Sequence, residues 1–297
     1  MNRRLSVLLV LLAVAAVPVF ANHAWGTYHW ARTTAQVTPP VTMNLTSAWT
    51  GYASRVMTDW NASPVIESAW SFGAISSRRR CTSAAGQIEV CNDTYGQNGW
   101  LGIAGISISG GHITKGYTKL NDTYYNTAQY NTPAWRRLVF CQEVGHDYGL
   151  AHQNEIFTNV NTGSCMDYTN APAGGILNGF NYGLSNEYPN AHDYEQLLAI
   201  YNHFDLVSLP FDELTADATR PTTMREYLNK ADQWGDPIAF DAEGRPTVFY
   251  QRVGTNHDGD HGDKPITEGE LIDVFWAPED PFEGMPQPGT GQRFQQQ

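Results

Sequence analysis

The stretch Gln142-Glu143-Val144-Gly145-His146-Asp147-Tyr148-Gly149-Leu150-Ala151-His152 decides the interpretation of this chain. Gln142 and His146 are one helical turn apart, so both lie on one helix face. His146 and His152 reach a common point only if the helix stops between them, and Gly149 permits that stop because glycine tolerates a positive φ. Glu143 then projects beside the same point, where a carboxylate can serve as a general base. The spacing predicts a metal site at the end of a helix.

The start of this helix is also signalled. Thr132 is a good N-cap residue, and Pro133 follows at the first-turn position, which tolerates a missing N–H. Leu138 begins an apolar face that continues into the polar residues of the motif. We therefore predict a helix that begins near Pro133 and ends at Gly149.

The segments around this helix alternate between helical and strand patterns. A helical stripe precedes it, and its members are Trp49, Tyr52, Ala53, Val56, Met57 and Trp60. A further helix begins at Asn190, which forms a capping-box pattern with Asp193. Strand-like runs are predicted at 65–72, 87–91, 100–109 and 112–120, and then at 237–240, 247–253 and 271–276.

A second short motif follows the first at Ser164-Cys165-Met166-Asp167-Tyr168. Together the two stretches resemble the metzincin clan of zinc endopeptidases, whose pattern is H-E-x-x-H-x-x-G-x-x-H followed by a methionine turn. The tyrosine two positions after the methionine resembles the astacin and serralysin branches. The strand order before the helix looks more like the matrixins.

The resemblance implies an α+β fold. A twisted mixed sheet would carry a backing helix and the active-site helix, and a lower half with the methionine turn would face it across a cleft. It implies Zn²⁺ held by His146 and His152, Glu143 as general base, and Met166 beneath the metal. Tyr168 is a candidate oxyanion stabiliser, with a plain buried aromatic as the alternative. An extended polypeptide substrate would pair with the edge strand 100–109.

Gln142 departs from the pattern, because histidine is expected at that position. An amide oxygen is a weaker zinc ligand than imidazole. If Gln142 completes the metal site, we expect a secreted metalloendopeptidase. If it does not, we expect a catalytically inactive, secreted binding module on the same scaffold. A third alternative is a wall or surface interaction protein that acts through residues 226–276.

The chain is expected to carry several regions. Arg3 and Arg4 precede an apolar run that ends in Val19-Phe20-Ala21, which predicts a signal peptide over 1–21 rather than a membrane anchor. The metzincin-like domain would span 22–205, a linker 206–225, a small β-rich appendage 226–278 and a disordered tail 279–297. The protein is therefore expected to be secreted and not membrane-bound after cleavage.

The four cysteines form an even set on an exported chain, which favours disulfides. Three pairings are open, of which we favour Cys81 with Cys91 and Cys141 with Cys165. A Cys165 thiolate as a metal ligand is the alternative.

Charge excludes one class of partner. Removing residues 1–21 takes away Arg3 and Arg4 and no acidic residue, so 16 basic residues face 30 acidic ones and the formal charge becomes −14. Such an acidic chain is not expected to bind nucleic acid. The sequence makes no prediction of oligomeric state.

Two polar features have ordinary explanations as well as functional ones. His192 could supply a missing metal ligand, but a packed histidine near a helix terminus is the favoured interpretation. The run 257–263 has carboxylates spaced as in calcium loops, yet it lacks the full loop pattern, so a solvated acidic turn is favoured.

Overall fold

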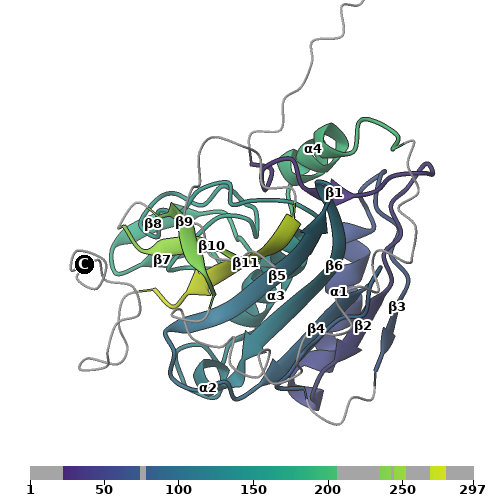
Figure 1. Cartoon of the computed structure of the whole chain (residues 1–297). Helices are drawn as coiled ribbons and strands as arrows, with labels where there is room; N and C mark the ends of the chain where they lie inside the picture. The colour runs from purple at the N-terminus through teal and green to yellow at the C-terminus, as the bar shows by residue number, and fades with distance from the viewer. Residues whose placement is uncertain (1–22, 74–77, 206–233, 242–243, 252–267, 279–297) are drawn as a thin grey trace, which may run out of the picture.

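The structure is a computed structural model that describes residues 23–73, 78–205, 234–241, 244–251 and 268–278. It has a mixed α+β architecture, with one large sheet covered on one side by helices (Figure 1). The strands are β1 (His29–Trp30), β2 (Val41–Asn44), β3 (Trp70–Phe72), β4 (Ile88–Asp93), β5 (Trp100–Ser109), β6 (His112–Asn121), β7 (Gly175–Leu177), β8 (Phe180–Gly183), β9 (Asp236–Phe240), β10 (Pro246–Gln251) and β11 (Glu268–Trp276). The helices are α1 (Ser47–Trp60), α2 (Asp122–Tyr125), α3 (Pro133–Asp147) and α4 (Ala191–Ile200).

The large sheet has the strand order β3-β2-β4-β6-β5-β11-β10-β9, and β1 pairs with β6. Strands β1 to β4 run parallel to their neighbours and to β6. From β6 onward each neighbouring pair is antiparallel, including β5 with β11. The predicted mixed sheet is therefore present.

Helices α1 and α3 pack against the same face of this sheet (Figure 1). The stripe expected on α1 is buried there through Trp49, Ala53, Val56, Met57 and Trp60. Helix α3 is buried along most of its length because the sheet covers one side and α1 and the segment 150–170 cover others. The main core lies between the sheet and these helices.

Local sequence signals fix the helix ends. The Thr132 side chain accepts a hydrogen bond from the backbone N–H of Trp135, and Pro133 occupies the first turn of α3. Asn190 and Asp193 form the expected capping box at the start of α4. These signals depend on neighbouring residues only, which explains why the sequence reveals them.

Two disulfides brace the structure, Cys81 with Cys91 and Cys141 with Cys165. They follow the pairing that was favoured from the sequence. The second one joins α3 to the methionine turn. Within the described residues, no helix is both long enough and apolar enough to cross a membrane.

Residues 226–278, predicted as an appendage, contribute the described strands β9, β10 and β11. These strands extend the large sheet beyond β5 and do not form a sheet of their own among the described residues. The predicted signal peptide, linker and tail lie outside the described residues. Of the run 65–72, only Trp70–Phe72 forms a strand, and residues 65–69 are irregular apart from an isolated bridge between Ile66 and Val37.

Candidate metal centre

The turn after α3 brings the two motif histidines together. Gly149 adopts φ +92°, and a Cβ atom at this position would lie 2.6 Å from the carbonyl oxygen of Tyr28. The backbone N–H of Leu150 still reaches the carbonyl of Gly145, so the chain folds back over the last helical turn. This turn carries His152 to the same side of α3 as His146.

The imidazoles of His146 and His152 face each other with 3.1 Å between their Nε2 atoms. On the other side of each ring, Nδ1 of His146 lies 2.7 Å from the carbonyl oxygen of Leu150, and Nδ1 of His152 lies 2.9 Å from Oε1 of Glu155. A carbonyl or carboxylate oxygen can only accept, so Nδ1 is the donor in both rings. If both rings are neutral, each directs the lone pair of Nε2 at the other, an arrangement that a cation or a proton shared between the two nitrogens stabilises.

Asp273 of β11 places a carboxylate oxygen beside the two rings. Its Oδ1 lies 3.3 Å from Nε2 of His152 and 3.5 Å from Nε2 of His146. The three residues are buried, and their ligand atoms all lie within 4.8 Å of one another. Two imidazoles and a carboxylate suit Zn²⁺, so the residues present fit the metal that the motif implies.

Sequence reasoning did not assign a role to Asp273. It lies in the apolar strand Leu271-Ile272-Asp273-Val274-Phe275-Trp276, so it is the only charged side chain in that run. A carboxylate within a buried strand requires a charged or hydrogen-bonding partner. That signal points to Asp273, but it does not reveal which residues lie opposite.

Glu143 lies in a closed environment. Its side chain is fully buried, and neither carboxylate oxygen has a hydrogen-bond partner among the described residues. Burial raises the pKa of Glu143 well above its usual value, and the negative charges of Asp273 and Asp147 raise it further. Gly102 of β5 makes room for it, because a Cβ atom there would lie 2.6 Å from Oε1.

The other titrating groups of the site shift in different directions. Burial acts to lower the pKa of His152, but the charge of Asp273 and the hydrogen bond to Glu155 outweigh it, so the pKa is raised. Burial lowers the pKa of His146 well below the usual range, and the neighbouring His152 lowers it further. Burial raises the pKa of Asp273 to about 7, although the charge of His152 opposes that rise.

Gln142 has one satisfied and one unsatisfied amide atom. Its Nε2 donates to the carbonyl oxygen of Cys165 at 2.7 Å, whereas its buried Oε1 has no hydrogen-bond partner among the described residues. Gln142 lies one turn before His146 on α3. An unpaired buried oxygen on this face is chemically suited to a cation, and the ligand role of Gln142 stays a prediction.

The methionine turn lies against the end of α3. The backbone N–H of Met166 bonds to Oγ of Ser164, and the Met166 sulfur lies 2.6 Å from the place that a Cβ atom of Gly145 would occupy. The backbone N–H of Gln153 donates to the carbonyl oxygen of Met166 at 2.6 Å. The turn thus supports both the helix and the segment that carries His152.

Tyr168 contacts the centre directly. Its ring centroid lies 4.5 Å from that of His152, and its Oη donates to the backbone carbonyl oxygen of Val274 at 3.3 Å. Val274 follows Asp273 in β11. Tyr168 therefore donates a hydrogen bond to the carbonyl of an extended chain that lies along β5.

Strand β11 covers the full edge of β5. Its pairing runs from Glu268 opposite Ser109 to Trp276 opposite Trp100. The edge at which a substrate was expected to pair is occupied by the protein's own C-terminal strand (Figure 1).

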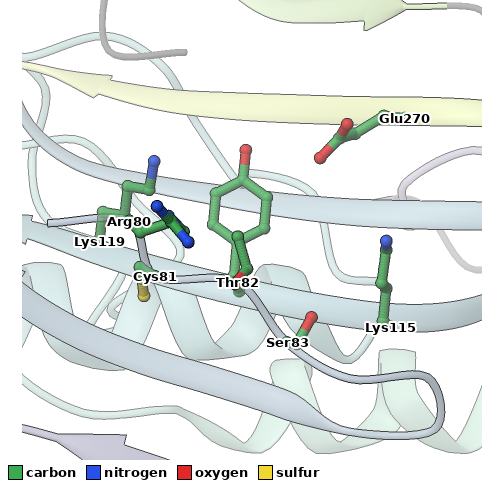
Figure 2. Close-up of a pocket in the computed structure, with 8 residues that line it drawn as sticks. Arg80, Cys81, Thr82, Ser83, Lys115, Lys119 and Glu270 are labelled. Carbon is green, nitrogen blue, oxygen red and sulfur yellow. The ribbon is translucent and has the colours of Figure 1, made fainter. Parts of the chain in front are cut away.

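A separate pocket lies on the opposite face of the sheet. Figure 2 shows the basic side chains Arg80, Lys115 and Lys119 around it, with Glu270 projecting from β11. Lys115 and Lys119 alternate along β6 with Gly116 and Thr118, and these two face Asp147 of α3. The sheet thus separates this pocket from His146.

The remaining candidates lie away from the centre or outside the described residues. The His192 ring lies 5.0 Å from that of His23 at the start of α4, and His192 belongs to neither of the His/Asp groups formed by described residues. The acidic run 257–263 lies outside the described residues.

Comparisons with models of known protein families and with curated proteins found no match for this chain. The site therefore has to be interpreted from its own geometry. That geometry defines a buried His/His/Asp group beside a glutamic acid, at a covered edge of the sheet.

Proposed function

We propose that this chain is a secreted, zinc-dependent metallopeptidase of the metzincin kind, held closed by its own C-terminal strand. The observation that carries the proposal is the convergence of the Nε2 atoms of His146 and His152, which lie 3.1 Å apart, together with Glu143 about one turn before His146 on the same helix. His146 and His152 would hold Zn²⁺ together with Asp273 in the closed form. A structural role for the helix alone does not require these residue types together.

Zinc in this position supplies polarisation of a peptide carbonyl and acidification of water. Glu143 would accept the proton from that water and pass it to the leaving amine. This role needs an ionised carboxylate. Removal of β11 would admit water and take away the charge of Asp273, and both changes lower the pKa of Glu143.

The proposed substrate is an unfolded or extended polypeptide. Strand β11 forms an antiparallel ladder along β5, and Tyr168 donates to its carbonyl at Val274. A substrate that replaced β11 would gain the same ladder by β-augmentation, and Tyr168 would then donate to a substrate carbonyl.

Asp273 explains why the closed form would be inactive. Catalytic zinc sites keep one position for water or substrate, whereas sites with a full protein ligand set are closed. With His146, His152 and the unpaired oxygen of Gln142 as three ligands, Asp273 takes the fourth position. Displacement of β11 would free that position and the β5 edge together.

The decisive experiment separates the C-terminal strands from the rest of the chain. A recognition site for a sequence-specific protease is inserted within residues 206–233, and the mature chain is cut and freed of the C-terminal fragment. We expect cleavage of an unfolded protein substrate to rise at least about a hundredfold after removal of the fragment. The same preparation carrying Glu143→Ala should retain zinc and remain inactive, because general-base catalysis contributes about 10²- to 10⁴-fold.

A non-catalytic binding module is the second candidate, and the closed state of Glu143 favours it. It predicts that the fragment-free chain folds, binds no metal and cleaves nothing, and that Glu143→Ala has no effect. That result would overturn the peptidase proposal. Secretion is proposed from the predicted signal peptide, and the two disulfides support an oxidising compartment.

A further inference from the structure

A second group of histidines lies on the surface where β1, the start of β6 and the segment after α4 meet. His29 belongs to β1, His112 begins β6, and His203 and Asp205 follow α4. No sequence motif connects these residues, since they come from three distant parts of the chain. His29, His112 and Asp205 are partly buried, with side-chain exposures of 13%, 17% and 12%, whereas His203 is exposed at 46%.

The ring nitrogens of this group converge on the carboxylate of Asp205. Nε2 of His112 lies 3.1 Å from Oδ1 of Asp205, and Nε2 of His29 lies 3.5 Å from Oδ2. His203 completes the group, with its Nε2 3.5 Å from Oδ1 of Asp205 and 3.0 Å from Nε2 of His29. A tetrahedral zinc ion with bonds of about 2.0 to 2.1 Å separates its ligands by about 3.3 Å. The ligand atoms of His29, His112 and Asp205 all lie within 4.8 Å of one another, and His203 adjoins this trio through His29 and Asp205.

The tautomer of His29 also favours a cation. Its Nδ1 lies 2.8 Å from the carbonyl oxygen of Thr27 and must donate, so Nε2 carries a lone pair when the ring is neutral. That lone pair faces the Nε2 of His203. The rings of His112 and His203 meet His29 at 67° and 79°, so neither of them stacks on His29.

The carboxylate of Asp205 is held in place by the backbone. Its Oδ2 accepts a hydrogen bond of 2.6 Å from the N–H of Arg32, and the N–H of Asp205 donates to the carbonyl oxygen of Arg32 at 2.8 Å. Outer hydrogen bonds of this kind orient metal ligands. The group is therefore arranged before any ion arrives.

We propose that His29, His112 and Asp205 form a second zinc site, with the exposed His203 as its fourth ligand, and that this site has a structural role. A tetrahedral ion held by four protein ligands leaves no position for a reacting water. The site would join three segments, of which β1 has only two residue pairs with β6. The same N-terminal segment contacts the end of the motif helix, because Nε1 of Trp30 donates to the carbonyl oxygen of Asp147 and the N–H of Trp25 donates to that of Gly149. Zinc here would stabilise the turn at Gly149 without touching a substrate.

The test removes the first site so that only the second can bind. The double variant His146→Gln/His152→Gln of the chain 22–297 should retain one zinc per chain after gel filtration, measured by elemental analysis. Replacing zinc with Co²⁺ should give the visible absorption of a tetrahedral ion. Addition of His112→Gln should reduce zinc to zero, whereas addition of His192→Gln, a matched histidine outside the group, should leave one. Added zinc should raise the melting temperature of the double variant and not that of the triple variant.

The outcomes decide the proposal whether or not the protein is a peptidase, because the double variant already lacks the histidines of the first site. A folded double variant that binds no zinc overturns it. If His112→Gln prevents folding, Asp205→Asn in the same background replaces it, since an amide preserves the shape and removes the charge. A folded Asp205→Asn chain that still holds one tetrahedral ion also overturns the proposal.

Discussion

The hydroxyl of Tyr168 donates a hydrogen bond of 3.3 Å to the backbone carbonyl oxygen of Val274, the residue that follows Asp273. One side chain thus contacts both the ring of His152 and the backbone of the strand that fills the β5 edge. In the proposed function a substrate carbonyl would replace that of Val274, so a substitution of Tyr168 can test whether its hydroxyl takes part in catalysis.

Tyr168→Phe in the fragment-free chain should lower kcat about 10²- to 10³-fold, the usual effect of removing one donor to a developing oxyanion. KM should change little, because the donor acts on the reacting carbonyl and not on the ladder along β5. Steady-state kinetics on a peptide substrate would measure both. Tyr182→Phe is the matched control at a buried tyrosine of β8, and it should leave kcat unchanged. Equal effects of the two variants would assign Tyr168 a packing role only.

Asp273→Asn in the uncut chain should weaken zinc binding at the His146/His152 centre by at least about tenfold, because loss of outer-shell partners alone has that effect. Competition with a chromophoric chelator would measure the affinity. Glu270→Gln alters the opposite face of the same strand, near the pocket of Figure 2, and should leave the affinity unchanged. An unaltered affinity in Asp273→Asn would show that this carboxylate is not a ligand.

Gln142→His in the fragment-free chain should raise zinc affinity by about tenfold or more, because imidazole is a stronger zinc ligand than an amide oxygen. The substitution can keep the existing contact, since one ring nitrogen can replace the Nε2 that donates to Cys165. The same competition assay measures it. Arg55→His on the exposed face of α1 controls for adding a histidine as such. Unchanged affinity would exclude position 142 from the metal site.

Gly149→Ala should destabilise the chain by at least about 1 to 2 kcal/mol, the cost of a left-handed conformation for a residue with a Cβ atom. The methyl group would also meet the carbonyl oxygen of Tyr28 at 2.6 Å. Chemical denaturation would measure the change. Gly51→Ala, in the exposed face of α1 where nothing lies within 4 Å, should instead raise stability by about 0.5 to 1 kcal/mol. If both substitutions lowered stability, or both raised it, the result would contradict the explanation given for Gly149.

The features that the sequence predicts are those encoded by neighbouring residues. Helix α3 has its cap, its first-turn proline and its terminal glycine within one segment, and β5 and β6 are long runs bounded by turn residues. Strands β1 and β2 are short, with two and four residues, and they are strands because longer partners lie beside them. No local sequence pattern indicates which strands will pair in this way.

For the site, too, the sequence predicts only what neighbouring residues encode. His146, His152 and Glu143 share one motif, so their proximity follows from helix geometry. Asp273 joins them only through the register of β11 on β5, in which it lies opposite Ala104. That register depends on tertiary packing, as does the meeting of His29 with His203 and Asp205.

The covered edge of β5 also sets an order of events during synthesis. Chains are made from the N-terminus, so both histidines of the motif leave the ribosome before Asp273 does, by an interval on the order of ten seconds. During that interval the pair of imidazoles exists without the carboxylate and the edge of β5 has no partner. A metal that bound during that interval would be enclosed when the last strand of the newborn chain pairs with β5.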